Sequence, residues 1–216
     1  MSLEALKRNG HRLELGAFEK AGEYDIPILR PVHLDRRLEW MRFNHALKEN
    51  QRARYGVQFF IDDYLFQRAW HDPPRYALFL LDFAAVTAPD FSMFTDYPRA
   101  VQIYNHWRKH QLAAYWQHTG ITVVPTIGWI DRESYSWCFD GEPEGSAVAV
   151  SSVGTQKNKE SRRLFLQGYN EMLSRLQPVK VIFFGNVPDE CGGNIEHHEP
   201  FYETFTKEID FRQNKR

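Results

Sequence analysis

The sequence lacks the motifs by which common nucleotide-dependent and zinc-dependent enzymes are recognised. It has no glycine-rich phosphate loop, no GxGxxG segment and no HExxH helix. Cysteine is scarce. Cys138 and Cys191 form no CxxC pair and match no zinc-type spacing, although the two could still join in a disulfide. Nucleotide hydrolysis, dinucleotide binding and zinc proteolysis are therefore not indicated.

Long apolar runs and an excess of either charge are absent as well. No apolar run reaches membrane-spanning length, and residues 1–20 are charged throughout, so we expect a cytoplasmic protein without a membrane partner. Lys and Arg total 27 against 28 Asp and Glu. This balance makes nucleic-acid binding a weaker hypothesis, because that function needs a positively charged face. The basic residues that would have to share such a face are Arg36, Arg37, Arg52, Arg54, Lys109, Arg162 and Arg163.

Aromatic residues, in contrast, are abundant and make up 15% of the sequence. Most such rings pack in cores, and others line ligand pockets. A chain of 216 residues can bury a core of this kind without disulfides or metals. We expect a single domain over 1–216, with its core over 25–186. The remainder, 187–216, is predicted to be a polar C-terminal extension that could form a short helix over 199–209.

The apolar pattern predicts alternating strands and helices. Helices are expected over 97–118, with Pro98 as first helical residue and Asp96 as cap, and over 158–176. The predicted strands are apolar throughout. They cover 38–43, 57–61, the end of 76–86, 121–126, 146–151 and 179–184.

Apolar strands separated by helices are typical of a parallel sheet that is covered on both faces. The predicted fold class is therefore α/β, with mostly parallel β/α repeats. A TIM-like or partial barrel is favoured over an open doubly wound sheet, because six or seven strands are expected and no glycine-rich nucleotide loop is present.

Five segments in this order resemble a domain family of unknown function found in bacteria, phages and integrative elements. The segments are FFIDDYLFQRAW (59–70), APDFSMFTDYPRAVQIYN (88–105), YWQHTGITVVPTIGW (115–129), CFDGEPEGSAVAVSSVG (138–154) and KVIFFG (180–185). The resemblance covers about 25–185 and implies a bacterial or mobile-element setting. It implies no activity, so it assigns no catalytic residue.

Polar side chains follow several predicted strands, at the ends where parallel α/β folds bind ligands. The candidates for catalysis are Asp62, Asp63, Asp90 and Asp140. The candidates for substrate binding are Ser92, Trp129, Asp131, Ser152 and Asn186. Each has a structural alternative. Asp62 or Asp63 could cap the next helix, Asp140 could serve a turn before Gly141, and Trp129 could fill the core.

Two chemistries remain open if two of these carboxylates meet. One is acid–base hydrolysis, in which different surroundings separate the pKa values of the two groups. The other is binding of a divalent metal ion through carboxylate oxygens. The sequence alone does not choose between them, because the carboxylates are far apart along the chain.

Two pairs of histidines are candidate metal ligands. His106 and His110 are four residues apart on the predicted 97–118 helix, a spacing that can hold a metal ion. Because Asn105, Arg108 and Lys109 surround them, we interpret this face as solvated surface. The 197–198 pair lies in the polar extension without a companion pattern and is a weak metal candidate.

Two functional hypotheses follow from these residues. The first is a hydrolase-type enzyme with an acidic and aromatic site at the carboxyl ends of the strands, acting on an unidentified small molecule with or without a divalent metal. The alternative is a non-catalytic binding or adaptor protein of a phage or mobile element that contacts a protein partner. The adaptor hypothesis predicts an exposed apolar patch.

Overall fold

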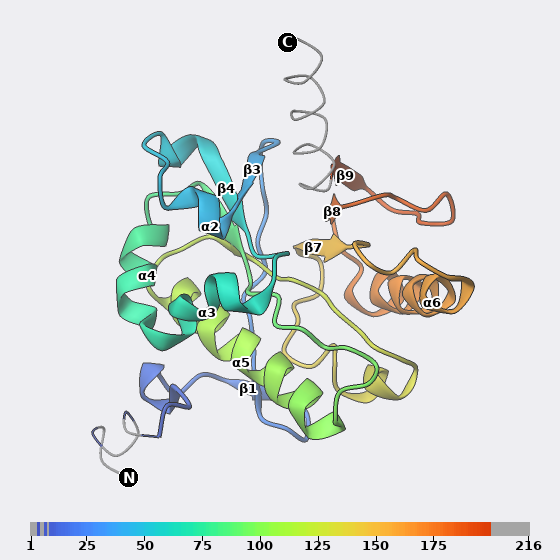
Figure 1. Ribbon diagram of the computed structural model, residues 1–216, viewed down its shortest axis with the longest axis horizontal. Coiled ribbons are helices and arrows are strands. Elements are labelled where there is room, and N and C mark those ends of the chain that lie inside the picture. The colour runs from blue at the N-terminus through green and yellow to red at the C-terminus, as the bar shows by residue number, and fades with distance from the viewer. Residues whose placement is uncertain (1–3, 5–6, 8, 200–216) are drawn as a thin grey trace, which may run out of the picture.

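The computed structural model describes residues 4, 7 and 9–199 and has a mixed α/β architecture (Figure 1). The strands are β1 (Lys20–Ala21), β2 (Ile26–Pro27), β3 (Glu39–Arg42), β4 (Tyr55–Gln58), β5 (Ala85–Thr87), β6 (Val123–Val124), β7 (Ala147–Ser151), β8 (Lys180–Phe184) and β9 (Ile195–His198). The α-helices are α2 (Phe43–Ala46), α3 (Asp63–His71), α4 (Pro73–Leu80), α5 (Arg99–His118) and α6 (Lys159–Leu176). Short 3₁₀ turns are η1 (Leu13–Leu15), η2 (Arg52–Arg54) and η3 (Glu133–Ser136).

Seven strands pair in the order in which they occur along the chain, and every pairing among them is parallel. One sheet has the order β3-β4-β5-β6 and another has the order β7-β8-β9. A single parallel bridge between Thr126 and Ala149 joins the two. An open doubly wound sheet reverses its strand order at a switch point, and no such reversal occurs in the described chain. The prediction of parallel β/α repeats is therefore confirmed.

The sheet curls strongly. The Trp40 ring on β3 packs edge-on against the Phe184 ring on β8, with ring centroids 5.8 Å apart. These strands are five steps apart in the pairing order, which would separate them by about 24 Å in a flat sheet. One buried cluster also joins Ala85, Val124 and Ile182 from three different strands. These side chains therefore line the concave face of a curved sheet.

The curled sheet is not a closed barrel. Within the described residues no strand pairing joins β9 to β3, so the hydrogen-bonded ladder has two ends. The expected TIM-like closure is therefore not observed. Contacts near the gap come from single groups instead, such as the Arg37 guanidinium, which donates to the His197 carbonyl over 2.8 Å.

Helices and one long loop cover the convex face. The helices α2 to α5 pack on β3 to β6 through residues such as Val57, Val86 and Trp116. Helix α6 packs on β7 and β8 through residues such as Phe165 and Phe183. The connection from β6 to β7 contains only η3, and this loop together with the β1-β2 hairpin covers α5 (Figure 1). Helix α5 is consequently buried on most of its circumference.

Two strands are shorter than their apolar runs predict, for reasons visible in the hydrogen bonds. The predicted strand 57–61 ends at Gln58, because the next N–H, that of Phe59, donates to the Thr87 hydroxyl instead of a neighbouring strand. The predicted strand 121–126 is reduced to β6, which is followed by Pro125. Proline has no N–H with which to continue a ladder.

Helix α5 begins differently from the prediction. Pro98 occupies the N-cap position, with Arg99 as first helical residue, and no side-chain cap is formed. The expected Asp96 cap is therefore wrong. In α6, Asn158 is the N-cap and its side chain accepts from the Ser161 N–H over 2.8 Å, so this predicted boundary is confirmed to within one residue.

The predicted C-terminal extension contributes a strand. β9 lies inside 187–216 and pairs with β8. The expected short helix over 199–209 lies outside the described residues from position 200 onward. Among the described residues, no helix combines the length and the apolar character that crossing a bilayer requires.

Candidate functional site

Polar side chains from two neighbouring strand ends meet beside α5. Asp63 begins α3 just after β4, and Ser92 follows β5. The Asp63 carboxylate accepts from the Ser92 hydroxyl over 2.8 Å and from the Ser92 N–H over 3.1 Å. The Arg108 guanidinium lies 3.4 Å from the same carboxylate and stacks over the Phe91 ring, 3.6 Å from its centre. We call Asp63, Asp90, Ser92 and Arg108 the rim cluster.

Asp90 is the least satisfied member of the rim cluster. It is half-buried, and its carboxylate has no hydrogen-bond partner within the part of the chain that the structure describes. Burial raises the pKa of Asp90 to about 7; the Lys109 ammonium opposes the rise and the Asp63 carboxylate adds to it. A carboxyl group that exchanges its proton near neutral pH suits acid–base catalysis.

The other predicted catalytic carboxylates lie elsewhere. Asp62 is exposed and precedes α3 without forming a side-chain cap. The Asp140 carboxylate lies against Gly22 in the β1-β2 turn, and burial raises its pKa, opposed by Arg175 and His110. Only the main-chain carbonyl of Asp140 contacts a candidate site residue, because it lies 3.1 Å from His106 Nε2. Of the four predicted catalytic residues, the structure brings together Asp63 and Asp90.

The candidates for substrate binding divide among three places. Ser92 belongs to the rim cluster. Asp131 accepts from the Ser134 N–H over 2.8 Å and pairs with Arg99 at 3.2 Å, which ties down η3. Trp129 packs on α6, where a Cβ on Gly168 would meet its ring at 2.1 Å.

Ser152 and Asn186 meet at the carboxyl ends of β7 and β8. The Ser152 hydroxyl donates to the Asn186 carbonyl over 2.7 Å. Both residues line a pocket of about 240 Å³, together with Gly154, Lys157 and Gly185. The Lys157 ammonium group and the glycine N–H groups could bind an anionic part of a substrate.

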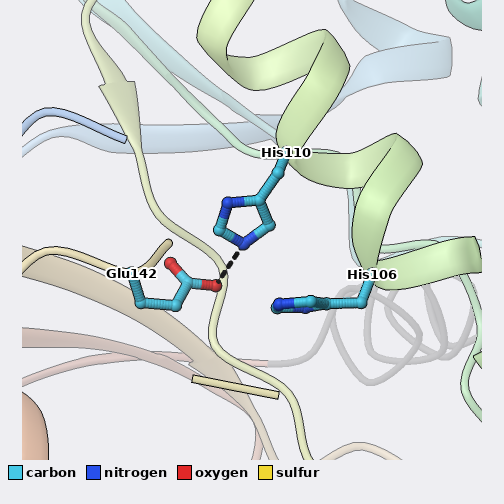
Figure 2. Close-up of side chains that lie close together, drawn as sticks. All are labelled: His106, His110 and Glu142. Carbon is cyan, nitrogen blue, oxygen red and sulfur yellow. Dashed lines mark hydrogen bonds and ion pairs between the residues drawn. The ribbon is translucent and has the colours of Figure 1, made fainter. Parts of the chain in front are cut away.

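A second group of polar side chains is buried under the β6-β7 loop. His106 and His110 point from α5 toward Glu142 of the loop (Figure 2), and Lys109 of the same helix also contacts Glu142. All four side chains are almost inaccessible to solvent. The Glu142 carboxylate accepts from the Lys109 ammonium over 2.6 Å and lies 2.9 Å from His110 Nε2. We call these four residues the buried cluster.

The buried cluster corrects the interpretation of the histidine pair as solvated surface. Both rings are 0% exposed, because β2 and the β6-β7 loop cover this side of α5. The spacing of His106 and His110 was the one available signal. Their burial depends on a loop from 30 residues further along, and Glu142 carries no local pattern that marks it.

Electrostatics in the buried cluster are set by burial and by Lys109. Burial lowers the pKa of His106 well below its ordinary value, and the charges of Lys109 and His110 lower it further. Burial alone would raise the pKa of Glu142, but Lys109 and His110 together outweigh burial and hold that pKa below its usual value. Glu142 therefore carries a negative charge in the interior.

Metal ligation is geometrically open to three members of the buried cluster. One ring nitrogen of His106, one of His110 and one oxygen of Glu142 lie within 4.8 Å of one another. Lys109 also connects the two clusters, because its ammonium contacts Glu142 and its charge acts on Asp90. The structure thus holds an acid–base group at the rim and a potential metal-ligand set behind it.

Comparisons with known proteins match this chain to one family, over a range of residues that includes both clusters. A family described as "Domain of unknown function (DUF4417)" matches residues 18–200. The Gene 1 protein of Mycobacterium phage L5 is 37% identical over 172 residues, which cover 79% of this chain and 75% of the phage protein. The Gene 1 protein of Mycobacterium phage D29 is 37% identical over 173 residues, covering 79% of this chain and 63%, less than two thirds, of the relative. No solved structure gives a significant match.

Proposed function

The chain belongs to the DUF4417 family, a domain family of unknown function with phage relatives. We propose from its side chains that it is a hydrolase-type enzyme in which Asp90 transfers protons. The observation that carries this proposal is the Asp90 carboxylate itself. It is half-buried at a strand end, has no hydrogen-bond partner in the described chain, and lies in the fields of one ammonium and one carboxylate. Unpaired carboxylates in such places are rare unless they are used.

In this proposal, Asp90 works in both protonation states. The ionised form accepts a proton from an attacking water, and the protonated form gives one to the leaving group. Asp63 holds Ser92 and Arg108 in place through its three contacts. The Lys109 ammonium stabilises negative charge that develops nearby. Ser152 and Asn186 would orient the substrate from the neighbouring pocket.

Metal-free chemistry is favoured at the rim cluster. Arg108 already pairs with Asp63, and Lys109 already lowers the cost of ionising Asp90. With Asp63 engaged by Arg108, the rim cluster offers one carboxylate without a partner among the described residues, fewer than the several oxygen ligands that Mg²⁺ or Ca²⁺ takes.

The first experiment compares the wild type with Asp90→Asn. Both proteins are assayed against chromogenic phosphate esters, carboxylic esters and glycosides from pH 5 to pH 8. We expect the wild type to hydrolyse one substrate class and Asp90→Asn to lower kcat/KM by about 10²- to 10⁴-fold, the usual contribution of general acid–base catalysis.

Asp96→Asn is the matched control for this experiment. Asp96 is an exposed aspartate on the loop that follows the same strand, and it has no contact with the rim cluster in the described structure. Its variant should keep wild-type kcat/KM. Equal activity in Asp90→Asn and the wild type would refute the role of Asp90, and a wild type inactive on all three classes would shift support to the adaptor function.

A second candidate function, binding of a phage-encoded protein, is favoured by one observation. Phe94, Tyr97, Val101 and Tyr104 are all exposed, from 36% to 57%. The first two precede α5 with their rings edge-on, 5.2 Å apart, and the other two lie in the first turns of that helix. Exposed apolar side chains that gather in one place commonly mark protein interfaces. A partner whose binding is lost in Phe94→Ser and kept in Asp90→Asn would support this function.

Nucleic-acid binding gains no support from the basic side chains. Arg52, Arg54, Arg162 and Arg163 are paired with Asp82, Glu39, Glu190 and Glu160. Lys109 is buried. Of the seven predicted basic residues, only Arg36 and Arg37 remain exposed without a carboxylate partner among the described residues, and two cations are few for a phosphate backbone.

We also propose that the curled sheet belongs to the TIM-like or partial-barrel class. The sequential order of its parallel strands and the Trp40–Phe184 contact across the concave face support this assignment. In such folds the ligand sites lie at the carboxyl ends of the strands, where the rim cluster and the 240 Å³ pocket occur.

A further inference from the structure

The buried cluster has more hydrogen-bond acceptors facing inward than donors to satisfy them. His110 Nδ1 lies 2.7 Å from the Pro27 carbonyl oxygen. A carbonyl only accepts, so Nδ1 carries the hydrogen and Nε2 presents a lone pair in the neutral ring. That lone pair faces the Glu142 carboxylate at 2.9 Å. Two acceptors so close need a proton or a cation between them.

His106 repeats this arrangement one helical turn earlier. Its Nε2 lies 3.1 Å from the Asp140 carbonyl oxygen, so this nitrogen carries a hydrogen. Its other nitrogen, Nδ1, is buried and has no hydrogen-bond partner among the described residues. A ring flip exchanges the two nitrogens and leaves one of them unpaired either way.

Glu142 supplies the third unpaired group. Its Oε1 accepts from Lys109, whereas Oε2 is buried and has no partner in the described structure. A buried carboxylate oxygen without a partner has lost its hydration without a hydrogen bond to replace it, which is unfavourable. A cation at this oxygen would remove that cost and need not displace Lys109 from Oε1.

We propose that His106, His110 and Glu142 bind a divalent transition-metal ion of the Zn²⁺ class. Two imidazoles and one carboxylate suit such an ion better than Mg²⁺ or Ca²⁺, which prefer oxygen ligands. The second nitrogen of each histidine faces a main-chain carbonyl, the arrangement that orients histidine ligands in metal sites. The ion would link α5 to the β6-β7 loop, and this inference does not depend on the proposed hydrolase activity.

The test uses tag-free full-length protein that has been stripped with a chelator and titrated with Co²⁺ and then Zn²⁺. We expect one ion per chain, visible absorption bands of protein-bound Co²⁺, and a rise in melting temperature of several degrees. His106→Gln and Glu142→Gln should each weaken Co²⁺ binding by about 100-fold or more, because each removes a ligand outright. His118→Gln, an exposed histidine at the end of the same helix, should bind Co²⁺ like the wild type.

X-ray absorption of the Zn²⁺-loaded wild type keeps the test decisive if a buried variant does not fold. We expect a shell of nitrogen and oxygen with the scattering pattern of two imidazoles. Sulfur in the shell would place the ion at Cys138 or Cys191 and overturn the proposal. The absence of stoichiometric binding by the wild type, or binding kept in both ligand variants, would overturn it too and leave a proton-linked His110–Glu142 pair.

Discussion

At the scale of single residues, the Asp90 carboxylate is expected to lower the free energy of unfolding at neutral and higher pH. Its pKa is about 7 in the folded protein against 3.8 for an ordinary aspartate. Between these pH values the unfolded chain is ionised while the folded chain still holds the proton. The free energy of unfolding therefore falls as the pH rises through this window, and the full loss is reached above pH 7.

Replacement of Asp90 by Asn should consequently stabilise the protein at pH 8 and have little effect near pH 4. The ceiling for this effect is about 4 kcal/mol, and because Asp90 is partly exposed we expect about 1–2 kcal/mol. Lys109 and Asp63 are the charged groups that act on it, and neither is changed. Urea denaturation from pH 4 to pH 8 measures the difference, and a difference that stays constant with pH would contradict it.

The control at this scale is again Asp96→Asn, whose stability relative to the wild type should not change between pH 4 and pH 8. The combination of lost activity and gained stability in Asp90→Asn is typical of a residue kept for function. A purely structural aspartate would show the reverse, since its removal would lower stability.

Residue types at strand ends predicted three of the four members of the rim cluster, and the reason is geometric. Asp63, Asp90 and Ser92 follow adjacent parallel strands, so their positions along the chain determine which edge of the sheet they share. Arg108 and Lys109 lie on α5, and which face of that helix meets the strand ends cannot be read from its polar sequence.

At the scale of elements, α5 departs most from what its sequence indicates. Its side chains Gln102, Asn105, Gln111 and Gln117 are all buried, although polar residues ordinarily mark a solvated face. They hydrogen-bond to main-chain groups of segments that wrap around the helix. The spacing of polar residues along a helix shows which face is polar. It does not show whether that face is exposed, because another segment of the chain can cover it and supply hydrogen-bond partners.

Gln117 shows the strength of these contacts. Its side chain accepts from the Arg30 N–H over 2.8 Å and donates to the Arg30 carbonyl over 2.9 Å. Gln117→Met keeps the shape of the side chain but removes these two bonds and a longer one to the Val123 carbonyl at 3.3 Å, leaving the Arg30 N–H and carbonyl without this partner. We expect a loss of about 2–3 kcal/mol in the free energy of unfolding, measured by urea denaturation.

Gln167→Met is the matched control for Gln117→Met. Gln167 is an exposed glutamine on α6 that accepts one bond from Arg163 on its own helix. Its replacement should change stability by less than about 0.5 kcal/mol. If the two variants lose similar amounts, the wrapping segment contributes no more than an ordinary surface contact.

At the scale of the whole molecule, the order of the strands was predictable and the curvature of the sheet was not. Alternating apolar runs and helices imply parallel neighbours in sequence order. Curvature depends on which side chains fill the concave face, and the side chains that meet there are far apart along the chain. Gly56 illustrates the point, because a Cβ there would meet the Trp40 ring at 2.5 Å, so glycine lets this ring lie across β4.

The Trp40–Phe184 contact makes the curvature measurable in solution. Trp40→Leu, Phe184→Leu and the double variant form a thermodynamic cycle, with unfolding free energies taken from urea denaturation. In a curled sheet the rings touch, and we expect a coupling energy of about 0.5–1.5 kcal/mol.

The control cycle pairs Trp40→Leu with Phe165→Leu. Phe165 is a residue of α6 whose ring packs on the opposite, convex face of the sheet. Those two changes should add without coupling, because no packing connects them. In a flat sheet β3 and β8 would lie about 24 Å apart, so the Trp40–Phe184 changes would then add as well. Additivity in both cycles would therefore reject the partial barrel, whereas coupling in the first alone would place β3 and β8 on facing walls.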